Sequence, residues 1–454
     1  MEGKVVVRKL QMFGVAALVA IVLGFSRQAA GQDPPSLADQ LFDNQVLQRI
    51  DLTMNSRDWE KLKANFEENT YYSVKIVWRG QTMPNAYVRS RGSGSRSGTK
   101  PGLRLDFNRN ASGAQEWIGL KSLIFDNLKQ DPSGMHEMLA FRLFERMGLP
   151  APREAFAQLY VNNKLAGLYT VVEPIDKRFL ARVFGAHEDG NVENDGYLFE
   201  YKWHYPYLLT SLGSELEKYQ EILEAKTHET EAISTVYDPI YRMVKEISES
   251  RDDLFERDVS PYLDLTQFMK YVGTQSALAE WDGLLGYAGV NNLYLYRFEK
   301  SKKSQFLVWD ADNTFHAIDY SITAEHDSNA LMKRAMKIPS LRSAYFTSLL
   351  EATRSAEEFS EEEAEADAKL KIAPRGWLAR EIDRLYAQIR TPMRSDPLKA
   401  FTNEEFEDAV AFMKQFAQER GGYVRCEAAK IIDPSRASEV CAAAASLRLQ
   451  SRTR

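Results

Sequence analysis

Asp282, Asn292 and Asp310 place two carboxylates and an amide within one short stretch of the sequence. Side chains of these types suit phosphoryl transfer from a nucleotide: one carboxylate orients or deprotonates the attacking hydroxyl, and the second carboxylate and the amide hold a metal ion against the phosphates. Mg²⁺ prefers oxygen ligands and keeps bound water, so two protein ligands and the phosphate oxygens suffice. A structural interpretation also fits, because Asp-Gly and Asn-Asn are common turn dipeptides and an Asp after a strand often caps the next turn.

A predicted hairpin would bring the amide and one carboxylate together. Residues 293–298 and 306–309 are apolar runs separated by a polar, charged stretch, which is the pattern of two antiparallel strands. A turn centred near Ser301 sets Leu293 across from Asp310, with side chains of paired or diagonal positions roughly 5 to 8 Å apart. We therefore expect the amide and this carboxylate at one end of the sheet.

A predicted helix upstream of the hairpin would deliver the other carboxylate. Apolar residues recur at helical spacing from Leu265 onward, after an Asp264-x-x-Gln267 start that imitates a capping box. We expect this helix to run to about Trp281. Asp282 would then lie at the exit of the helix, one short loop before the hairpin.

The segment 92–98 consists only of Gly, Ser and Arg and lies between two strand patterns. Glycine lets backbone N–H groups converge on an anion, and Arg91, Arg96 and Lys100 add charge that matches phosphate oxygens. This composition favours a hairpin that covers a triphosphate. A mobile surface loop fits equally well, because the sequence here has no G-x-x-x-x-G-K-[ST] motif.

Several motifs resemble the CotH (spore coat protein H) family of atypical, secreted protein kinases. Asp282-Gly283, the N-L-Y-L-Y run that starts at Asn292 and the V-W-D-A-D-N-T-F run of residues 308–315 carry the resemblance most clearly. Further blocks agree in the same order, with V-R-S-R-G-S-G-S, K-P and L-R-L in residues 88–105 similar to the family's arginine- and glycine-rich loop. The resemblance extends over about residues 46–315.

This resemblance implies an α+β, two-lobed fold like that of an atypical protein kinase, with a β-rich N-terminal lobe and a mostly helical C-terminal lobe. It implies an enzyme that transfers the γ-phosphate of ATP to serine or threonine of exported proteins with Mg²⁺, or with Mn²⁺ as a second option. By motif position, it implies Asp282 as the catalytic aspartate, Asp310 and Asn292 as metal ligands, and Arg89, Arg91 and Lys100 as phosphate-binding residues.

Two positions depart from the pattern that the family leads us to expect. Nine residues separate Asp282 from Asn292, where a shorter gap closed by His-Asn is expected, so either Asn291 or Asn292 could reach the metal. His136 stands where the family tends to carry an arginine, which leaves a phosphate contact from that helix open.

Two other classes of protein fit parts of the same sequence. The apolar run before Asp310, followed by D-A-D-N-T, also resembles haloacid-dehalogenase-type phosphatases, in which Asp310 would be a nucleophile that forms an aspartyl-phosphate. That fold needs alternating parallel strands and helices after the motif, whereas the downstream sequence is mostly helical and charged. The third class is a non-catalytic surface binding or adhesion protein on a kinase-like scaffold.

The first 31 residues read as a secretory signal peptide. They begin with basic residues, continue with an apolar run and end in small residues, with cleavage expected near Ala30 or Gly31. The apolar run is short for a membrane span, so we expect a secreted or periplasmic protein without a stable span. Cleavage would lower the net charge from −6 to −9, and an acidic chain argues against nucleic acid as a partner.

The length of 454 residues, with 44% hydrophobic content, predicts two or three domains or lobes. Strand patterns cover 72–78, 85–91 and 102–107, and one helix is expected over 134–147. The expected order is a signal peptide (1–31), a linker (32–45), a β-rich lobe (46–207), a helical lobe with the hairpin (208–425) and a tail (426–454).

The only two cysteines, Cys426 and Cys441, both lie in this tail. An exported chain favours a local disulfide between them, and two free thiols remain compatible with the sequence. No Cys and His residues show the spacing of a zinc site. Beyond an exported protein substrate and a nucleotide, the sequence specifies neither the phosphoacceptor nor the oligomeric state.

Overall fold

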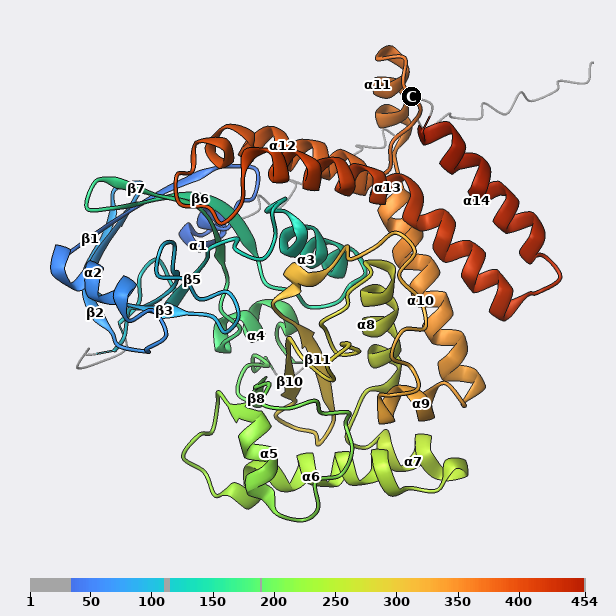
Figure 1. Ribbon diagram of the computed structural model, residues 1–454. Helices are drawn as coiled ribbons and strands as arrows, with labels where there is room; N and C mark the ends of the chain where they lie inside the picture. The colour runs from blue at the N-terminus through green and yellow to red at the C-terminus, as the bar shows by residue number, and fades with distance from the viewer. Residues whose placement is uncertain (1–33, 110–114, 188–189, 453–454) are drawn as a thin grey trace, which may run out of the picture.

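The computed structural model describes residues 34–109, 115–187 and 190–452 (Figure 1). The predicted signal peptide, residues 1–31, lies outside the described residues. Within the described ranges, no helix combines the length and the apolar character needed to span a bilayer. The expected α+β organisation is confirmed, with a β-rich N-terminal half and a mostly helical C-terminal half.

Seven strands of the N-terminal half close into a barrel in the order β1-β2-β3-β4-β5-β7-β6. Neighbouring strands are antiparallel except for β1 and β6, which run parallel. The barrel has its own apolar core, to which alternate residues such as Ile50 and Leu52 contribute. All three predicted strands are confirmed. The bounds are β1 (Gln48–Met54), β2 (Tyr72–Trp78), β3 (Gln81–Arg91), β4 (Gly102–Asp106), β5 (Ser122–Asp126), β6 (Glu154–Val161) and β7 (Lys164–Val172).

A second sheet of four antiparallel strands, in the order β11-β10-β8-β9, carries the predicted hairpin. The hairpin is confirmed but its expected register is wrong: Leu293 pairs with Val308 and not with Asp310. The loop closes earlier than expected, because the Phe298 N–H donates to the Lys303 carbonyl at 3.1 Å. Asp310 therefore lies beyond the last strand pair. The strands are β8 (Tyr197–Tyr201), β9 (Leu223–Ala225), β10 (Leu293–Arg297) and β11 (Ser304–Val308).

Helices pack around this second sheet and form the larger apolar core of the molecule. Figure 1 shows α12 crossing over the barrel, while α8 lies beside the hairpin and α10 packs against α8. The helices are α1 (Leu37–Leu41), α2 (Ser56–Ala64), α3 (His136–Arg146), α4 (Lys177–Phe184), α5 (Leu216–Ile222), α6 (Ile233–Glu249), α7 (Phe255–Val259), α8 (Leu265–Ala277), α9 (Ala330–Ala335), α10 (Pro339–Glu357), α11 (Glu361–Lys369), α12 (Trp377–Ser395), α13 (Asn403–Ile432) and α14 (Ala437–Arg452).

Helix α8 begins where the sequence indicates but ends earlier than Trp281. The Asp264 side chain caps it by accepting from the Gln267 N–H at 3.0 Å. The helix ends at Ala277 because Ala279 takes a left-handed conformation with φ of +54°. Asp282 consequently lies in a loop that leaves the helix several residues before it.

The C-terminal region is helical and contains one disulfide bond. Cys426 of α13 and Cys441 of α14 are joined, so the pairing that the sequence left open is formed. Figure 1 shows α14 lying along the end of α13, as this bond requires.

Candidate functional site

Asp310 follows strand β11 and starts a short 3-10 turn, Ala311–Asn313. Its backbone is left-handed, with φ of +52° and ψ of +53°, a region in which Asp and Asn are the best tolerated non-glycine residues. Desolvation raises the pKa of its carboxyl to about 6, against the lowering effect of Arg91. Asp126 and Asp282 raise this pKa further, so both carboxylates lie close to Asp310.

Asp282 is held by two side-chain amides. Asn291 and Asn292 donate to its carboxylate at 3.2 and 3.3 Å, and Asn292 also donates to its carbonyl at 3.1 Å. Burial raises the pKa of Asp282 and these amide bonds oppose the rise. The amide nitrogen of Asn292 thus serves Asp282, and its amide oxygen is the atom that remains for any other ligand.

Two backbone segments meet between these carboxylates. We call residues 276–282, which end at the predicted catalytic aspartate, the first catalytic segment, and residues 310–320, which begin at the predicted metal ligand, the second catalytic segment. The Phe315 and His316 N–H groups donate to the Leu278 and Ala279 carbonyls at 2.7 and 3.2 Å. These bonds fix how Asp282 and Asp310 lie relative to each other.

Backbone strain is concentrated in the same place. Ala279 and Phe315 in the two catalytic segments, together with Asn292 and Asp310, all have φ between +51° and +58°. Such conformations cost about 1–3 kcal/mol each and persist where the surroundings impose them, often at functional sites. The catalytic segments therefore have a geometry that local preferences alone do not produce.

Glu280 is a buried carboxyl beneath Asp282, with 7% of its surface exposed. Its carboxylate accepts the Asp282 N–H at 3.0 Å. Desolvation raises the pKa of Glu280 to about 8. The sequence analysis missed this residue, although it lies in the same E-W-D-G run as Asp282.

Arg91, at the end of β3, is the predicted phosphate-binding residue that the structure places beside Asp310. Its guanidinium donates to the Asp126 carboxylate at 3.4 Å and lies 5.8 Å from the centre of the Trp309 ring. Desolvation lowers its pKa, but Asp310, Asp126 and Glu137 outweigh that effect, so the net shift is upward. Arg91 therefore brings positive charge from the barrel to the side of the site where Asp310 lies. We call this the metal side, because Asp310 is the predicted metal ligand.

The structure does not bring the other two predicted phosphate-binding residues to Asp310. Lys100 forms a buried ion pair with Asp396 at 2.7 Å, and the two side chains are 4% and 0% exposed. The Leu168 N–H donates to the same carboxylate oxygen at 2.9 Å. Arg89 is bound by the Tyr71 hydroxyl and the Asn69 side chain, at 3.2 and 2.8 Å.

The Gly/Ser/Arg loop 92–98 is held in place by two cationic side chains, Arg96 within the loop and Lys129 outside it. Arg96 donates to the carbonyls of Gly92 and Phe66, both at 2.8 Å. Lys129 donates to the carbonyls of Gly94 and Arg96 at 3.2 and 2.9 Å. These bonds give the loop a defined shape over an open surface hollow lined by Gly92, Ser93 and Gly94.

Further carboxyls that the sequence analysis missed surround the metal side of the site. A small cavity is lined by acidic residues from β5, the connection that follows it, α3, β6 and the second catalytic segment, namely Asp126, Asp131, Glu137, Glu154 and Asp312. Desolvation and mutual repulsion raise the pKa values of Glu137 and Asp312. Only Asp312, from the D-A-D run, stood near the predicted ligands in the sequence.

Glu154 is the most isolated carboxyl of this group. It is 4% exposed, and neither of its oxygens has a hydrogen-bond partner in the described part of the chain. Desolvation raises its pKa to about 8, although the nearby Thr170 lowers it. No three Asp, Glu, His or Cys side chains of the described residues form a preassembled metal site. An excess of poorly neutralised carboxyls nevertheless fits an ion such as Mg²⁺, whose remaining ligands are water and phosphate.

His136, which departs from the family pattern, lies against the second catalytic segment. The ring nitrogen Nδ1 of His136 lies 2.9 Å from the Asp312 carbonyl oxygen. The backbone N–H of His136 donates to the Asp131 carboxylate at 2.8 Å. The ring packs 5.2 Å from that of Phe315. In this position His136 supports the backbone that carries the acidic residues.

The phosphatase interpretation does not match the sheet. Its Asp310 would follow a strand of a parallel sheet, whereas β11 pairs antiparallel with β10, and β10 pairs antiparallel with β8. The regular elements after the 3-10 turn that follows Asp310 are all helices in the described residues.

Comparison with known proteins gives the family. A family model described as CotH kinase protein matches residues 88–424, which run from the end of β3 into α13 and include Arg91, Asp282, Asn292 and Asp310. Inner spore coat protein H of Bacillus subtilis (strain 168) is 22% identical over 392 residues, which cover 82% of this chain and 95% of the relative. The resemblance inferred from the motifs is confirmed: this chain belongs to the CotH kinase family and is a kinase-like protein.

Proposed function

We propose that this protein is an exported, Mg²⁺-dependent protein kinase that transfers the γ-phosphate of ATP to serine or threonine. The observation that carries the proposal is the grouping of Asp282 and Asn292, joined by a hydrogen bond at 3.3 Å, with Asp310, which follows the strand that pairs with the one after Asn292. Arg91 lies on the same side, because its guanidinium is 5.8 Å from the centre of the Trp309 ring. Membership of the CotH kinase family supports the reaction class. The family relative is a spore coat protein, which supports a place outside the cytoplasm together with the predicted signal peptide.

Asp282 would orient the acceptor hydroxyl and accept its proton. Its carboxylate is fixed by Asn291 and Asn292, and its partial burial raises the pKa, which strengthens it as a base. A bound Mg²⁺ would neutralise the phosphate oxygens, with the Asp310 carboxylate and the amide oxygen of Asn292 as its protein ligands. Arg91 would contact the phosphates from the barrel side.

Lys100 has a different role in this proposal from the one expected from the motif. Its ammonium is buried against Asp396 near the end of α12, so it fastens the barrel to the helical lobe. The carbonyl of Lys100 also accepts from the Asn127 side chain at 2.8 Å, and Asn127 donates to the Ser95 carbonyl at 2.9 Å. Lys100 would therefore act on the nucleotide by anchoring the loop 92–98.

The phosphoacceptor segment would lie on an exposed aromatic surface next to Asp282. Tyr287 is 59% exposed and stacks on Trp281 at 4.4 Å, and Trp281 stacks on His316 at 4.9 Å. Trp203 is 48% exposed and donates to the Ala288 carbonyl at 3.2 Å. The long gap between Asp282 and Asn292 thus forms a braced loop that presents the Tyr287 ring to solvent.

The decisive experiment incubates the mature protein with γ-labelled ATP, Mg²⁺ and a mixture of exported proteins. We expect label on serine or threonine, and loss of that label in Asp282→Asn. Asp238→Asn, which changes a carboxylate of α6 that pairs with Arg242, is the matched control and keeps activity.

Two outcomes would contradict the proposal. A hydroxylamine-labile label on Asp310 itself would favour the phosphatase chemistry. Absence of label, together with no effect of ATP and Mg²⁺ or Mn²⁺ on thermal stability, would favour a binding or adhesion protein.

A further inference from the structure

We propose that Arg420 of α13 is a positioning residue that staples the two catalytic segments together. The proposal deepens the function proposed above and rests on it. Its physical content is that one guanidinium fixes the separation of Asp282 and Asp310 without touching either of them. Arg420 lies 4% exposed, far along the chain from both.

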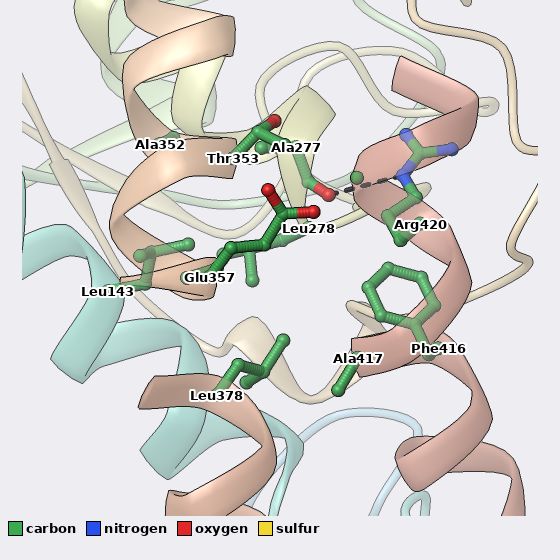
Figure 2. A pocket seen from close by; sticks show the side chains of 12 residues that line it. Leu143, Ala277, Leu278, Ala352, Thr353, Glu357, Leu378, Phe416, Ala417 and Arg420 are labelled. Atoms are coloured by element: carbon green, nitrogen blue, oxygen red, sulfur yellow. Dashed lines mark hydrogen bonds between the residues drawn. The ribbon is translucent and has the colours of Figure 1, made fainter. Parts of the chain in front are cut away.

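Arg420 donates four hydrogen bonds to backbone carbonyls of the catalytic segments, while its guanidinium also lies over the rings of Phe416 and Tyr423. In the first segment it donates from Nε to the Ala277 carbonyl at 3.2 Å and from Nη2 to the Ser276 carbonyl at 2.5 Å. In the second segment Nη1 donates to the carbonyls of Ile318 and Tyr320 at 2.9 and 2.7 Å. Figure 2 shows the Arg420 side chain reaching from α13 toward Ala277.

The chemistry of these carbonyls explains why an arginine is needed. Ser276 and Ala277 are among the last residues of α8, whose final carbonyls carry the negative end of its dipole. The Ser276 carbonyl also accepts the Ala279 N–H at 3.2 Å, so Arg420 adds a charged donor to it. A planar guanidinium with several N–H donors can bond carbonyls of the first and second catalytic segments at the same time. Desolvation lowers the pKa of Arg420 to about 10, so the cation is retained at neutral pH.

The bonds of Arg420 extend a ladder of backbone hydrogen bonds that already joins the two catalytic segments. Between its two ends, the Phe315 and His316 N–H groups donate to Leu278 and Ala279. Arg420 holds the outer end of this ladder, and Asp282 and Asp310 lie toward the other end. A displacement of about 1 Å at a reacting group can cost roughly 100-fold in rate, so loosening the outer end should reduce catalysis.

Packing near Arg420 leaves room for a shorter side chain. A small cavity of about 20 Å³ lies beside it, lined by apolar residues that include Leu278, Leu378 and Phe416 (Figure 2). Arg420→Met can fill this space without steric conflict, and it removes the donors. Arg420→Lys keeps the charge but has a single donor group.

Arg334 provides a matched control in the same lobe. It donates to the carbonyls of Ile247 and Ser250 at the end of α6, so it makes the same kind of contact with a helix terminus. It also bonds Asp252 at 3.1 Å. Arg334 contacts neither catalytic segment in these bonds.

The kinetic test measures kcat and the KM for ATP in the full chain of each variant. We expect Arg420→Met to lower kcat by about 100-fold while the KM for ATP changes less than about threefold, because Arg91 and the loop 92–98 are untouched. Arg420→Lys should recover part of this loss. Arg334→Met should lower the melting temperature and leave kcat unchanged.

A second readout does not depend on activity. Amide hydrogen exchange should become faster at Trp281, Phe315 and His316 together in Arg420→Met, and should stay slow there in Arg334→Met. If kcat in Arg420→Met equals that in Arg334→Met, or if these amides remain protected, the staple is refuted. If the wild-type protein transfers no phosphate, the proposed function fails while the exchange result still decides whether the staple exists.

Discussion

The junction between the lobes and the metal side of the site both bury charge, but they neutralise it differently. At the junction, Asp396 accepts from Lys100 and from the Leu168 and Leu398 N–H groups, so every buried charge has partners. At the site, Glu154 has no hydrogen bond among the described residues and Asp310 has a raised pKa. A satisfied buried ion pair indicates architecture, whereas a group of buried carboxyls with raised pKa values, one of them without a hydrogen bond, favours the proposed place for a cation.

The largest expected effect tests the site side of this comparison. Asp310→Asn should reduce phosphoryl transfer by about 1,000-fold or more, because it removes the charge of a metal ligand that stabilises the transition state. The free energy of unfolding without metal should stay constant or rise, since a repulsive carboxylate is lost. Labelled transfer and chemical denaturation measure the two quantities.

Asp319→Asn is the control for this prediction, because Asp319 is exposed on the same catalytic segment. A large loss of stability in Asp310→Asn with normal activity would contradict this prediction, because Asp310 would then stabilise the fold and not hold a catalytic metal ion.

The next effect tests the junction side. Lys100→Met should lower the free energy of unfolding by about 3–5 kcal/mol, because it leaves the Asp396 carboxylate buried without its counter-ion. Lys61→Met, which breaks an exposed pair with Asp58, should cost less than about 1 kcal/mol. Urea denaturation of both variants gives the comparison directly.

The double variant Lys100→Met/Asp396→Asn sharpens this prediction, because asparagine removes the charge and keeps an acceptor oxygen for the backbone N–H groups. It should recover much of the lost stability and bind ATP normally. Normal stability with weak ATP binding would instead assign Lys100 to the phosphates.

A smaller effect concerns pH. The pKa of Glu154 rises from its ordinary 4.5 to about 8 in the folded protein, so between these values the folded state holds a proton that the unfolded state has released. The free energy of unfolding should therefore fall as pH rises from about 4.5 to about 8. Glu154→Gln should remove the contribution of this group, so the slope becomes shallower, and it should stabilise the protein at pH 8 by at least about 1 kcal/mol. The slope that remains comes from other carboxyls such as Asp310 and Glu280, whose pKa values are also raised.

Denaturation at a series of pH values, in metal-free buffer, measures this effect. Glu217→Gln on the surface of α5 should keep the wild-type slope. An unchanged slope in Glu154→Gln would show that Glu154 does not hold a proton in the folded protein over this pH range, which contradicts the prediction.

The smallest expected effect concerns the acceptor. Tyr287→Ala should raise the KM for the protein substrate severalfold and leave the KM for ATP unchanged, because Tyr287 lies on the exposed aromatic surface and not beside Arg91. Steady-state kinetics with each substrate varied in turn separates the two constants. Tyr205→Ala, at an exposed tyrosine of the neighbouring segment, shows how far that surface extends.

The sequence predicted the parts of the structure that depend on local pattern. Strand periodicity located β2 and most of β3, and the Asp264 cap located the start of α8. The end of α8 was missed because Ala279 adopts a conformation that alanine does not favour by itself.

Long-range contacts were beyond the reach of such patterns. The Lys100 and Asp396 partners are 296 positions apart, and a lysine after a Gly-rich loop looks the same in sequence whether it binds phosphate or a distant aspartate. Arg420 and Glu154 became visible only through tertiary burial. The motif resemblance supplied the three central residues, and the fold supplied the groups that position and neutralise them.

The left-handed backbone at Asp310 limits how this site can change over evolutionary time. Asparagine and glycine accept φ of +52° with little strain, whereas other replacements would distort the turn as well as the chemistry. A lineage that abandons phosphoryl transfer can therefore exchange this one carboxylate for an amide and keep an intact scaffold. The same feature predicts that inactive descendants would carry Asn or Gly at position 310 and would still fold, ready for recruitment as binding proteins.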